Sequence, residues 1–354
     1  MKGRFKVKTT KIKKGSGENR ATNILDNANN CLTYKSIENY NPVWLINDLV
    51  LKNTLVSFYG MPGSGKSLTT LFLAINLLKS GAVKKVYYID ADNGYVTLKN
   101  RGLDKILKKF PNLRYIATSK IDSEIDTKTL IVDIAKQIKS GREGETLYIF
   151  DSIRNFIDGN MHKDQEVMPI LETLQKMRSF CAGVWFLNHQ PKQSLSAGAE
   201  NDKRYKGATA FFDTPDELYF IQKRRYDKDA KQLVVTLEPM KKRDDTEPIA
   251  AIINTKSTDI KFESYKKYAL SEKENLSLDY AIEIIEKSNK ELCLSELITK
   301  IKERAHKDRA DNEICGVNAL KELLKDFEGY RYFIERTTSI RNREKLIFRS
   351  ANSI

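Results

Sequence analysis

The stretch from Gly60 to Ser67 constrains the fold more than any other part of the chain. It reads Gly-Met-Pro-Gly-Ser-Gly-Lys-Ser and matches the pattern G-x-x-x-x-G-K-[ST]. This pattern has physical meaning only between a buried strand and a helix. A β-branched and aromatic run, 55–59, precedes it. Apolar residues spaced three or four apart follow it, at Leu68, Leu71, Phe72, Ile75 and Leu78. The sequence therefore predicts a strand, a phosphate-binding loop and an amphipathic helix.

The glycines of this loop allow successive backbone N–H groups to turn inward around a phosphate, at a helix N-terminus whose dipole favours anions. We expect Lys66 to reach the β- and γ-phosphates and the hydroxyl of Ser67 to ligate Mg²⁺. The ligands are thus a nucleoside triphosphate, with ATP as the expected one, and Mg²⁺. The predicted nucleotide contacts are Gly60, Pro62, Gly63, Ser64, Gly65, Lys66, Ser67 and Leu68.

Charge and apolar patterning narrow the class of partner. The 354 residues carry a formal net charge of +14, which favours a polyanion, and nucleic acid over a membrane surface. The longest apolar stretch, 68–78, is too short to span a bilayer, and the N-terminus lacks the apolar run of an export signal. The four cysteines and three histidines show no metal-ligand spacing. We expect a reduced, cytoplasmic protein without a structural metal.

Composition divides the chain into three parts. Residues 1–40 form a basic arm that we expect to be flexible, because 1–20 hold eight Lys or Arg residues and few apolar ones. The arm is either a solvated tail or a source of nonspecific phosphate contacts. Residues 41–265 form an α/β domain. Residues 266–354 form a small α+β domain, in which three helices and a basic hairpin follow the order of a winged helix.

The α/β domain alternates buried strands with helices of 11 to 18 residues. We expect strands over 85–90, 113–118, 146–151 and 184–187, and helices over 127–140 and 164–181. Shorter strands are predicted over 217–222, 232–237 and 249–254. Strands separated by such helices indicate βαβ units, so the fold class is α/β with a mostly parallel central sheet.

Three carboxylates end two of these strands. Asp151 closes an apolar run in the form of a Walker B strand, whose carboxylate holds magnesium. Ser152 follows it where many ATPases have the Glu that positions the attacking water. That carboxylate must therefore come from the end of the neighbouring strand, as Asp90 or Asp92.

Cations mark a long irregular segment, 191–206, inside this domain. Long loops in compact domains are often functional, and this one holds Lys192, Lys203, Arg204 and Lys206. These residues are either a backbone-tracking surface for nucleic acid or a solvated basic loop. In the small domain the third helix is acidic, which favours partner contacts slightly over DNA reading.

The order of these motifs resembles the RecA-like ATPase family, and within it the hexameric replicative helicases of the DnaB and plasmid RepA kind. The resemblance covers about residues 40–240. It rests on Ile89-Asp90-Ala91-Asp92, the run from Tyr148 to Phe156, Phe186-Leu187-Asn188-His189, Tyr205-Lys206-Gly207-Ala208 and the strand from Asp216 to Lys223. No N-K-x-D motif of a GTPase and no transporter signature is present.

The resemblance implies roles for individual residues. Asp92 would be the catalytic carboxylate, although the family has Glu there and Asp90 remains a rival. Asp151 would be the magnesium-associated carboxylate and His189 the sensor of the γ-phosphate. A cation of the cluster Lys223-Arg224-Arg225, with Lys223 or Arg224 favoured, would reach into the next subunit's site. Arg154 and the cations of 191–206 would line a central pore around nucleic acid.

The expected function is that of an ATP-driven motor on single-stranded DNA: a replicative-type helicase and DNA-stimulated ATPase that acts as a homo-oligomeric ring, with a hexamer favoured. Two alternatives stay open. One is a RecA-like recombination or repair ATPase that forms a filament. The other is a DNA-binding replication initiator in which ATP only switches assembly. The small domain is a candidate contact for replication proteins.

Overall fold

The computed structural model describes residues 31–120, 126–140, 143–190, 207–288, 291–328, 332–338 and 344–350. The chain forms two compact units, one up to Val43 and one from Trp44 onward. The first unit contains helix α1 (Tyr34–Glu38), which buries no residue and begins after the capping residue Thr33. Its residues belong to the stretch predicted as a flexible arm.

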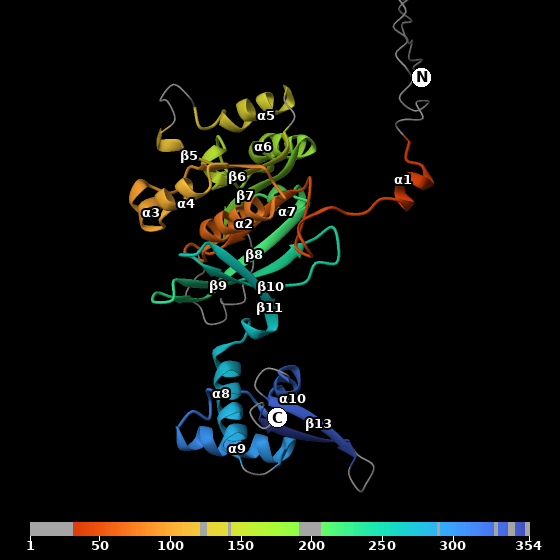
Figure 1. The fold of residues 1–354 in the computed structure, drawn as a ribbon, viewed down its shortest axis with the longest axis vertical. Helices are drawn as coiled ribbons and strands as arrows, with labels where there is room; N and C mark the ends of the chain where they lie inside the picture. Colours follow the sequence, from red (N-terminus) through yellow and green to blue (C-terminus); the bar gives the residue numbers. More distant parts are fainter. Residues whose placement is uncertain are drawn as a thin grey trace, which may run out of the picture. The chain divides into compact units, whose positions relative to one another are not determined.

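A nine-stranded sheet organises the described part of the second unit (Figure 1). The strands are β3 (Leu55–Gly60), β4 (Lys85–Asp90), β5 (Leu113–Ala117), β6 (Glu143–Asp151), β7 (Cys181–His189), β8 (Glu217–Asp227), β9 (Gln232–Lys241), β10 (Ile249–Asn254) and β11 (Asp259–Ser264). Their order is β11-β10-β9-β8-β3-β7-β6-β4-β5. Every pair from β8 to β5 is parallel, whereas β9, β10 and β11 extend the sheet as an antiparallel meander. A short hairpin, β1 (Trp44–Ile46) and β2 (Val50–Leu51), precedes the sheet.

This strand order decides where the chemistry lies. β7 separates the phosphate-loop strand β3 from β6, and β4 lies on the far side of β6. Gly60 pairs with His189, and Asp90 pairs with Asp151. Because the strands are parallel, their carboxyl ends meet at one edge of the sheet, where open α/β sheets bind their ligands.

Helices cover both faces of the sheet (Figure 1). On one face α2 (Lys66–Ser80), α3 (Tyr95–Asn100) and α4 (Leu103–Lys109) share a core with Phe58, Tyr88 and Trp185. On the other face α5 (Leu130–Ser140), α6 (Asp164–Met177) and α7 (Ala210–Asp213) share a core with Phe150 and Phe186. Short 3₁₀ turns occupy Thr118–Lys120, Ile153–Phe156, Arg178–Phe180 and Tyr265–Lys267.

The predicted fold class is confirmed, and the differences lie at element ends and in short elements. The helix predicted to reach Cys181 ends at Met177, because Cys181 already starts the buried strand β7. Helices α3 and α4 were not predicted, since they have only six and seven residues and show too few turns for a clear period. The edge strand β11 was also missed, because Lys and Asp residues interrupt its apolar pattern.

The C-terminal residues form the helices and hairpin that the sequence predicts. They are α8 (Glu272–Glu286), β12 (Leu292–Cys293), α9 (Leu294–Lys307), α10 (Val317–Asp326), β13 (Tyr332–Thr338) and β14 (Glu344–Ser350). The three strands form a separate sheet, β12-β14-β13, and the helices pack on it around a core that includes Leu297, Leu320 and Phe348. Element order and separate core support the winged-helix-like description.

In the described ranges no helix combines the length and apolar character needed to cross a lipid bilayer. All four cysteines lie in those ranges and are free thiols.

Candidate nucleotide site

The phosphate loop has the backbone that its glycines predict. Gly63 and Gly65 adopt φ angles of 77° and 85°, in the region that favours glycine. A Cβ on Gly60 would collide with the main-chain oxygen of Ile221 on β8, so this position also needs glycine. Helix α2 begins at Lys66 without a side-chain cap. Its first N–H groups are therefore available to an anion.

Lys66 lies inside this loop rather than in solvent. Its Nζ donates to the carbonyl oxygens of Gly60 at 3.0 Å and Met61 at 2.9 Å. Burial lowers the pKa of Lys66 to about 8, although the nearby charges of Asp151 and Asp92 act in the opposite direction. The ammonium group is thus desolvated and poorly neutralised, and phosphate oxygens would stabilise it.

Asp151 and Ser67 form the oxygen pair expected for Mg²⁺. Asp151 is 2% exposed and accepts hydrogen bonds from the hydroxyls of Tyr88, at 2.9 Å, and Ser67. Burial, followed by repulsion from Asp90, raises the pKa of Asp151 to about 6. A buried carboxylate whose charge is this unfavourable suits a cation, and hard oxygen donors suit Mg²⁺.

The donor set also fits the way magnesium is usually held. Among the described residues no group of three or more His, Cys, Asp or Glu side chains could cage a metal. Mg²⁺ typically keeps water ligands and takes one or two protein oxygens plus substrate phosphates. Ser67 and Asp151 provide that number.

Asp90 and Asp92 differ sharply although they are two residues apart. Asp90 is 1% exposed, and its Oδ1 accepts the backbone N–H groups of Asp92 and Asn93, each at 2.9 Å. Its Oδ2 accepts the hydroxyl of Tyr115 and the side-chain amide of Asn93. Asp92 is exposed and lines the pocket in front of the phosphate loop. The geometry thus leaves Asp92 open to a substrate and uses Asp90 to hold the turn.

A pocket of 390 Å³ gathers most of the predicted catalytic and nucleotide-binding residues, but Gly60, Ser64, Asp151 and Arg224 do not line it. Its lining consists of Pro62, Gly63, Gly65, Lys66, Ser67, Leu68, Asp92, Asn93, Arg101, His189, Lys223, Tyr226 and Leu233. The carboxyl ends of β3, β4 and β7, together with the β8–β9 hairpin, supply most of this set. The site therefore combines an anion cradle, a carboxylate and several cations.

Lys223 and Arg224 lie on opposite sides of β8, as adjacent strand residues do, and the strand has a bulge at Arg224. Lys223 pairs with Val235, and Arg225 pairs with Val234, so Arg224 is the extra residue. Lys223 lines the pocket, whereas the Nε of Arg224 donates to Thr236 at 3.1 Å and its guanidinium lies 3.9 Å from Glu238. The structure therefore brings Lys223 to the site and keeps Arg224 away from it.

The comparisons with known proteins agree with this geometry. Residues 34–194 match the family described as the AAA domain. That segment contains the phosphate loop, Asp92, Asp151 and His189, on the parallel strand order described above. This part of the chain is thus similar to an AAA domain, and the phosphate loop lies within the matched residues.

One curated relative matches a short part of this chain. The DNA repair and recombination protein RadB of Methanobrevibacter smithii is 46% identical over 50 residues, which are 14% of this chain and 20% of the relative. The chain thus matches about a fifth of that relative's length.

Two solved structures are similar at low identity. The flagellar accessory protein FlaH of Methanocaldococcus jannaschii is 16% identical with a TM-score of 0.40, over 60% of this chain and 90% of that one. A second structure, described as an ATPase domain, is 14% identical with a TM-score of 0.44, over 64% of this chain and 94% of that one.

Four pocket residues of the ATPase domain escaped the sequence reasoning: Asn93, Arg101, Tyr226 and Leu233. Arg101 follows α3, an element too short to predict, and Asn93 follows Asp92 directly. Tyr226 faces the pocket only because the bulge at Arg224 shifts the alternation of β8. The Asp-Asn-Gly turn after β4 was the one usable signal, since Asn can hydrogen-bond its own turn.

The predicted nucleic-acid contacts divide into two groups. Arg154 is exposed in the 3₁₀ turn after Asp151, where the ATPase domain could present it to a ligand. Lys192, Lys203, Arg204 and Lys206 lie outside the described residues.

Proposed function

We propose that the protein is an ATP-driven motor on single-stranded DNA, a replicative-type DNA helicase that acts as a ring, with six subunits favoured. The observation that carries this proposal is the nucleotide pocket. There the phosphate loop, with Lys66 and Ser67, and the exposed carboxylate of Asp92 face one space, and the buried Asp151 lies behind Ser67 and accepts its hydroxyl. Proteins that only sense a nucleotide do not need a carboxylate positioned for water.

In this proposal the side chains share the work of hydrolysis. Lys66 stabilises charge on the transferred phosphoryl group, and Asp92 orients or deprotonates the attacking water. Ser67 and Asp151 would hold Mg²⁺, which would supply Lewis-acid stabilisation of the phosphate oxygens. His189, at the end of β7 beside Gly60, would sense the γ-phosphate.

The open side of the pocket supports action between subunits. Pro62, Gly63 and Asp92 are exposed, so a bound triphosphate would remain accessible to water and to a neighbouring subunit. Lys223 already lines the pocket of its own chain. Arg225, whose side chain is 68% exposed, is therefore the better remaining candidate for a cation that acts on a neighbour's site.

Positive charge supports DNA as the polymer along which the proposed motor moves. The net charge of +14 favours a polyanion as partner, and Arg154 is exposed next to the carboxyl end of β6. The cations of 191–206 would add to this surface.

A recombination or repair ATPase is the second candidate, and the RadB match favours it. The two candidates differ in assembly and in product. A ring helicase would displace a strand from a forked duplex in the presence of ATP. A filament former would coat single-stranded DNA without displacing a strand.

Electron microscopy with a non-hydrolysable ATP analogue and a single-stranded oligonucleotide separates ring, filament and monomer. A strand-displacement assay on a forked duplex with ATP complements the microscopy, because it measures unwinding directly. Rings with displacement support the helicase, filaments without displacement support the second candidate, and monomers without displacement contradict both.

Mixing variants tests action between subunits. Lys66→Ala disables the nucleotide pocket of a subunit, and Arg225→Ala removes the cation that the subunit would offer to its neighbour's pocket. In a mixed oligomer, some Arg225→Ala subunits have an intact pocket next to a Lys66→Ala subunit that still carries Arg225, so some sites should be complete. We expect the mixture to exceed the sum of the two separate ATPase rates. Rates that only average would remove Arg225 from this role.

A further inference from the structure

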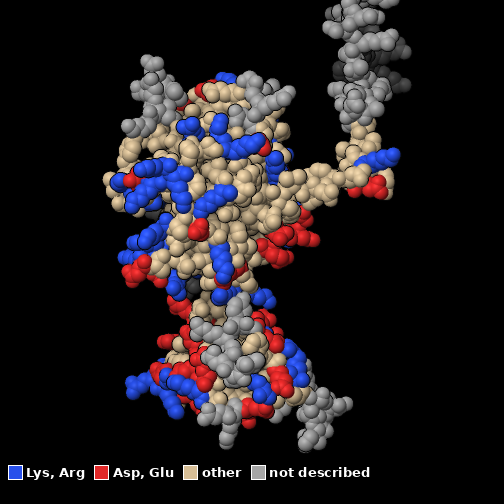
Figure 2. Space-filling model, viewed as in Figure 1, with Lys and Arg blue, Asp and Glu red and all other residues tan. Residues whose placement is uncertain are grey.

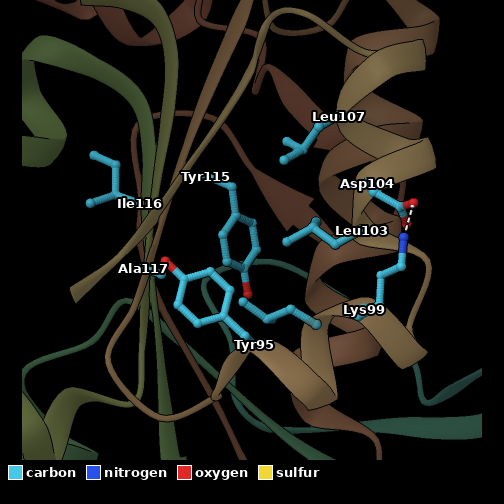
Figure 3. Close-up of a pocket in the computed structure, with 9 residues that line it drawn as sticks. Tyr95, Lys99, Leu103, Asp104, Leu107, Tyr115, Ile116 and Ala117 are labelled. Carbon is cyan, nitrogen blue, oxygen red and sulfur yellow. Dashed lines mark hydrogen bonds and ion pairs between the residues drawn. The ribbon is translucent and has the colours of Figure 1, made fainter. Parts of the chain in front are cut away.

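A second hollow lies between α3, α4 and β5 and shares no lining residue with the nucleotide pocket. Its volume is 470 Å³ and its walls are mostly apolar. Figure 3 shows Leu103 and Leu107 pointing from α4 toward the ring of Tyr115. Tyr95, at its rim, is 53% exposed, and the adjacent Val96 is 76% exposed. We call this hollow the α4 groove. An apolar groove of this size can hold one or two large apolar side chains.

The surface around the α4 groove is strongly basic. Residues 95–115 hold six Lys or Arg residues and one acidic residue, Asp104. Asp104 is already ion-paired with Lys99 at 2.6 Å, as Figure 3 shows. Lys108 lies one helical turn after Asp104 and therefore on the same side of α4. Figure 2 shows the blue side chains that gather over α3 and α4. A partner must therefore be apolar at its centre and negative around it.

We propose that the α4 groove binds an acidic segment of a partner protein through one or two large apolar anchors. A polynucleotide would neutralise the cations, but its phosphates could not fill an apolar hollow. A neutral apolar segment would fill the hollow but would not neutralise the excess of positive charge around it. An acidic segment with apolar anchors matches both features.

The α4 groove is connected to the nucleotide site through Tyr115. The ring of Tyr115 forms part of the wall, and its hydroxyl donates to Asp90. Asp90 holds the backbone of the turn that carries Asp92. The ring also stacks on Tyr88, with centroids 4.9 Å apart, and Tyr88 donates to Asp151. A segment bound in the groove can thus change ATP turnover, a consequence that rests on the proposed role of Asp92.

Binding is tested with a designed probe. The probe is a fluorescein-labelled peptide of about 12 residues with Leu or Phe at every third or fourth position and Glu elsewhere. One matched peptide replaces each Glu by Lys, and another replaces each apolar residue by Ser. We expect the probe to bind the full chain with a Kd on the order of 10 to 100 μM, and both controls at least about tenfold more weakly. Equal binding of the probe and the Ser peptide would overturn the proposal.

Two variants locate the site. Lys99→Glu combined with Lys108→Glu should weaken the probe by about tenfold or more and leave basal ATPase unchanged. The matched control, Lys300→Glu with Lys302→Glu on the exposed side of α9, should bind the probe like the wild type. Loss of binding in both double variants would mean that the probe senses only net charge, which contradicts a specific groove.

Competition decides the occupant. A single-stranded oligonucleotide that displaces the probe, and loses affinity in the Lys99 and Lys108 variant, would assign this surface to nucleic acid. A peptide of residues 31–43, where Leu32, Tyr34 and Ile37 are exposed, would identify a second copy if it bound and the probe did not. Either result would overturn the proposal.

The link to turnover has its own test. Tyr115→Phe keeps the ring in the wall and removes the hydroxyl on Asp90. We expect a saturating concentration of the probe to change the kcat of the wild type by about twofold or more. The probe should still bind Tyr115→Phe but leave the kcat of that variant unchanged. An equal response in both proteins contradicts the link. Binding of the probe is measured by fluorescence anisotropy, which does not require ATPase activity. Failure of the proposed ATPase function can therefore be distinguished from failure of the proposed groove.

Discussion

Two buried carboxylates, one at each end of the central sheet, differ in how the fold treats their charge. At the amino end, Asp216 accepts the N–H of Leu55 at 2.9 Å and forms ion pairs with Arg178 and Arg243. At the carboxyl end, Asp151 accepts two hydroxyls, and its pKa is raised to about 6 by burial and by repulsion from Asp90. The first carboxylate is neutralised by the fold itself, and the second suits a ligand.

This difference separates structural charge from functional charge within one sheet. Breaking a neutralised ion pair leaves buried charges behind and costs stability. Removing a side chain whose charge the fold does not neutralise should cost activity and little stability, as expected for a preorganised site. Substitutions that measure both stability and activity test whether a given charge is structural or functional.

The largest effect is expected for Lys66→Ala at the carboxyl end. Without the ammonium the phosphate loop loses its charge contact to the β- and γ-phosphates, so ATPase activity should fall to background. The thermal midpoint should not decrease, because the wild-type Lys66 is desolvated. Phosphate release and a melting curve measure the two quantities. Retained turnover would remove the central assignment.

Asp92→Asn should lower kcat by about 10² to 10⁴ with nearly unchanged ATP affinity, because Asp92 is exposed and would act on water. Asp90→Asn is the matched variant. It should lower the melting temperature as well, since Asp90 accepts hydrogen bonds from four donor groups. A kcat loss confined to Asp90→Asn, without loss of stability, would reverse the two roles.

At the amino end, Asp216→Ala should destabilise the fold by about 3 kcal/mol, because it leaves two arginines and the N–H of Leu55 without their acceptor. Nucleotide affinity of the folded protein should not change. Urea unfolding measures the midpoint. Asp259→Ala, which removes an exposed ion pair with Lys79, is the control and should leave the midpoint nearly unchanged. Equal shifts in both variants would contradict the division.

The smallest effect concerns Glu217, which is 1% exposed beside Asp216. Burial raises the pKa of Glu217 to about 7, despite the N–H of Leu51 and the charge of Arg243. The neutral form therefore suits the fold. The stability that the protonated Glu217 contributes is complete below about pH 4.5 and is lost as the pH rises through about 7. Glu217→Gln should stabilise the protein by about 2 kcal/mol at pH 8 and by little near pH 4.5. A pH-independent difference would mean that Glu217 does not titrate in this range.

The carboxyl end was largely predictable from sequence, and the amino end was not. A phosphate loop between a buried strand and an amphipathic helix is a local pattern, and so is an apolar strand that ends in Asp151. Each pattern places its polar residues directly after a buried strand, and therefore at the carboxyl edge of a parallel sheet. The ion pairs of Asp216 join residues 38 and 27 positions away, and no local pattern shows such contacts.

Within the nucleotide site, the roles that sequence left open depend on burial, on hydrogen bonds and on the side of a strand from which a residue points. Asp90 and Asp92 look alike in the sequence, but Asp90 is buried and accepts four hydrogen bonds, whereas Asp92 is exposed. Lys223 and Arg224 look alike as well, but Lys223 lines the pocket and Arg224 lies beside Thr236 and Glu238. These features are three-dimensional, so the catalytic roles stay predictions until variants are measured.

The most direct test of the proposed motor is steady-state phosphate release by the purified protein at saturating ATP and Mg²⁺, with and without single-stranded DNA. We predict that DNA raises the rate severalfold, and that the increase grows with protein concentration because subunits must assemble. A rate that responds neither to DNA nor to protein concentration would contradict it.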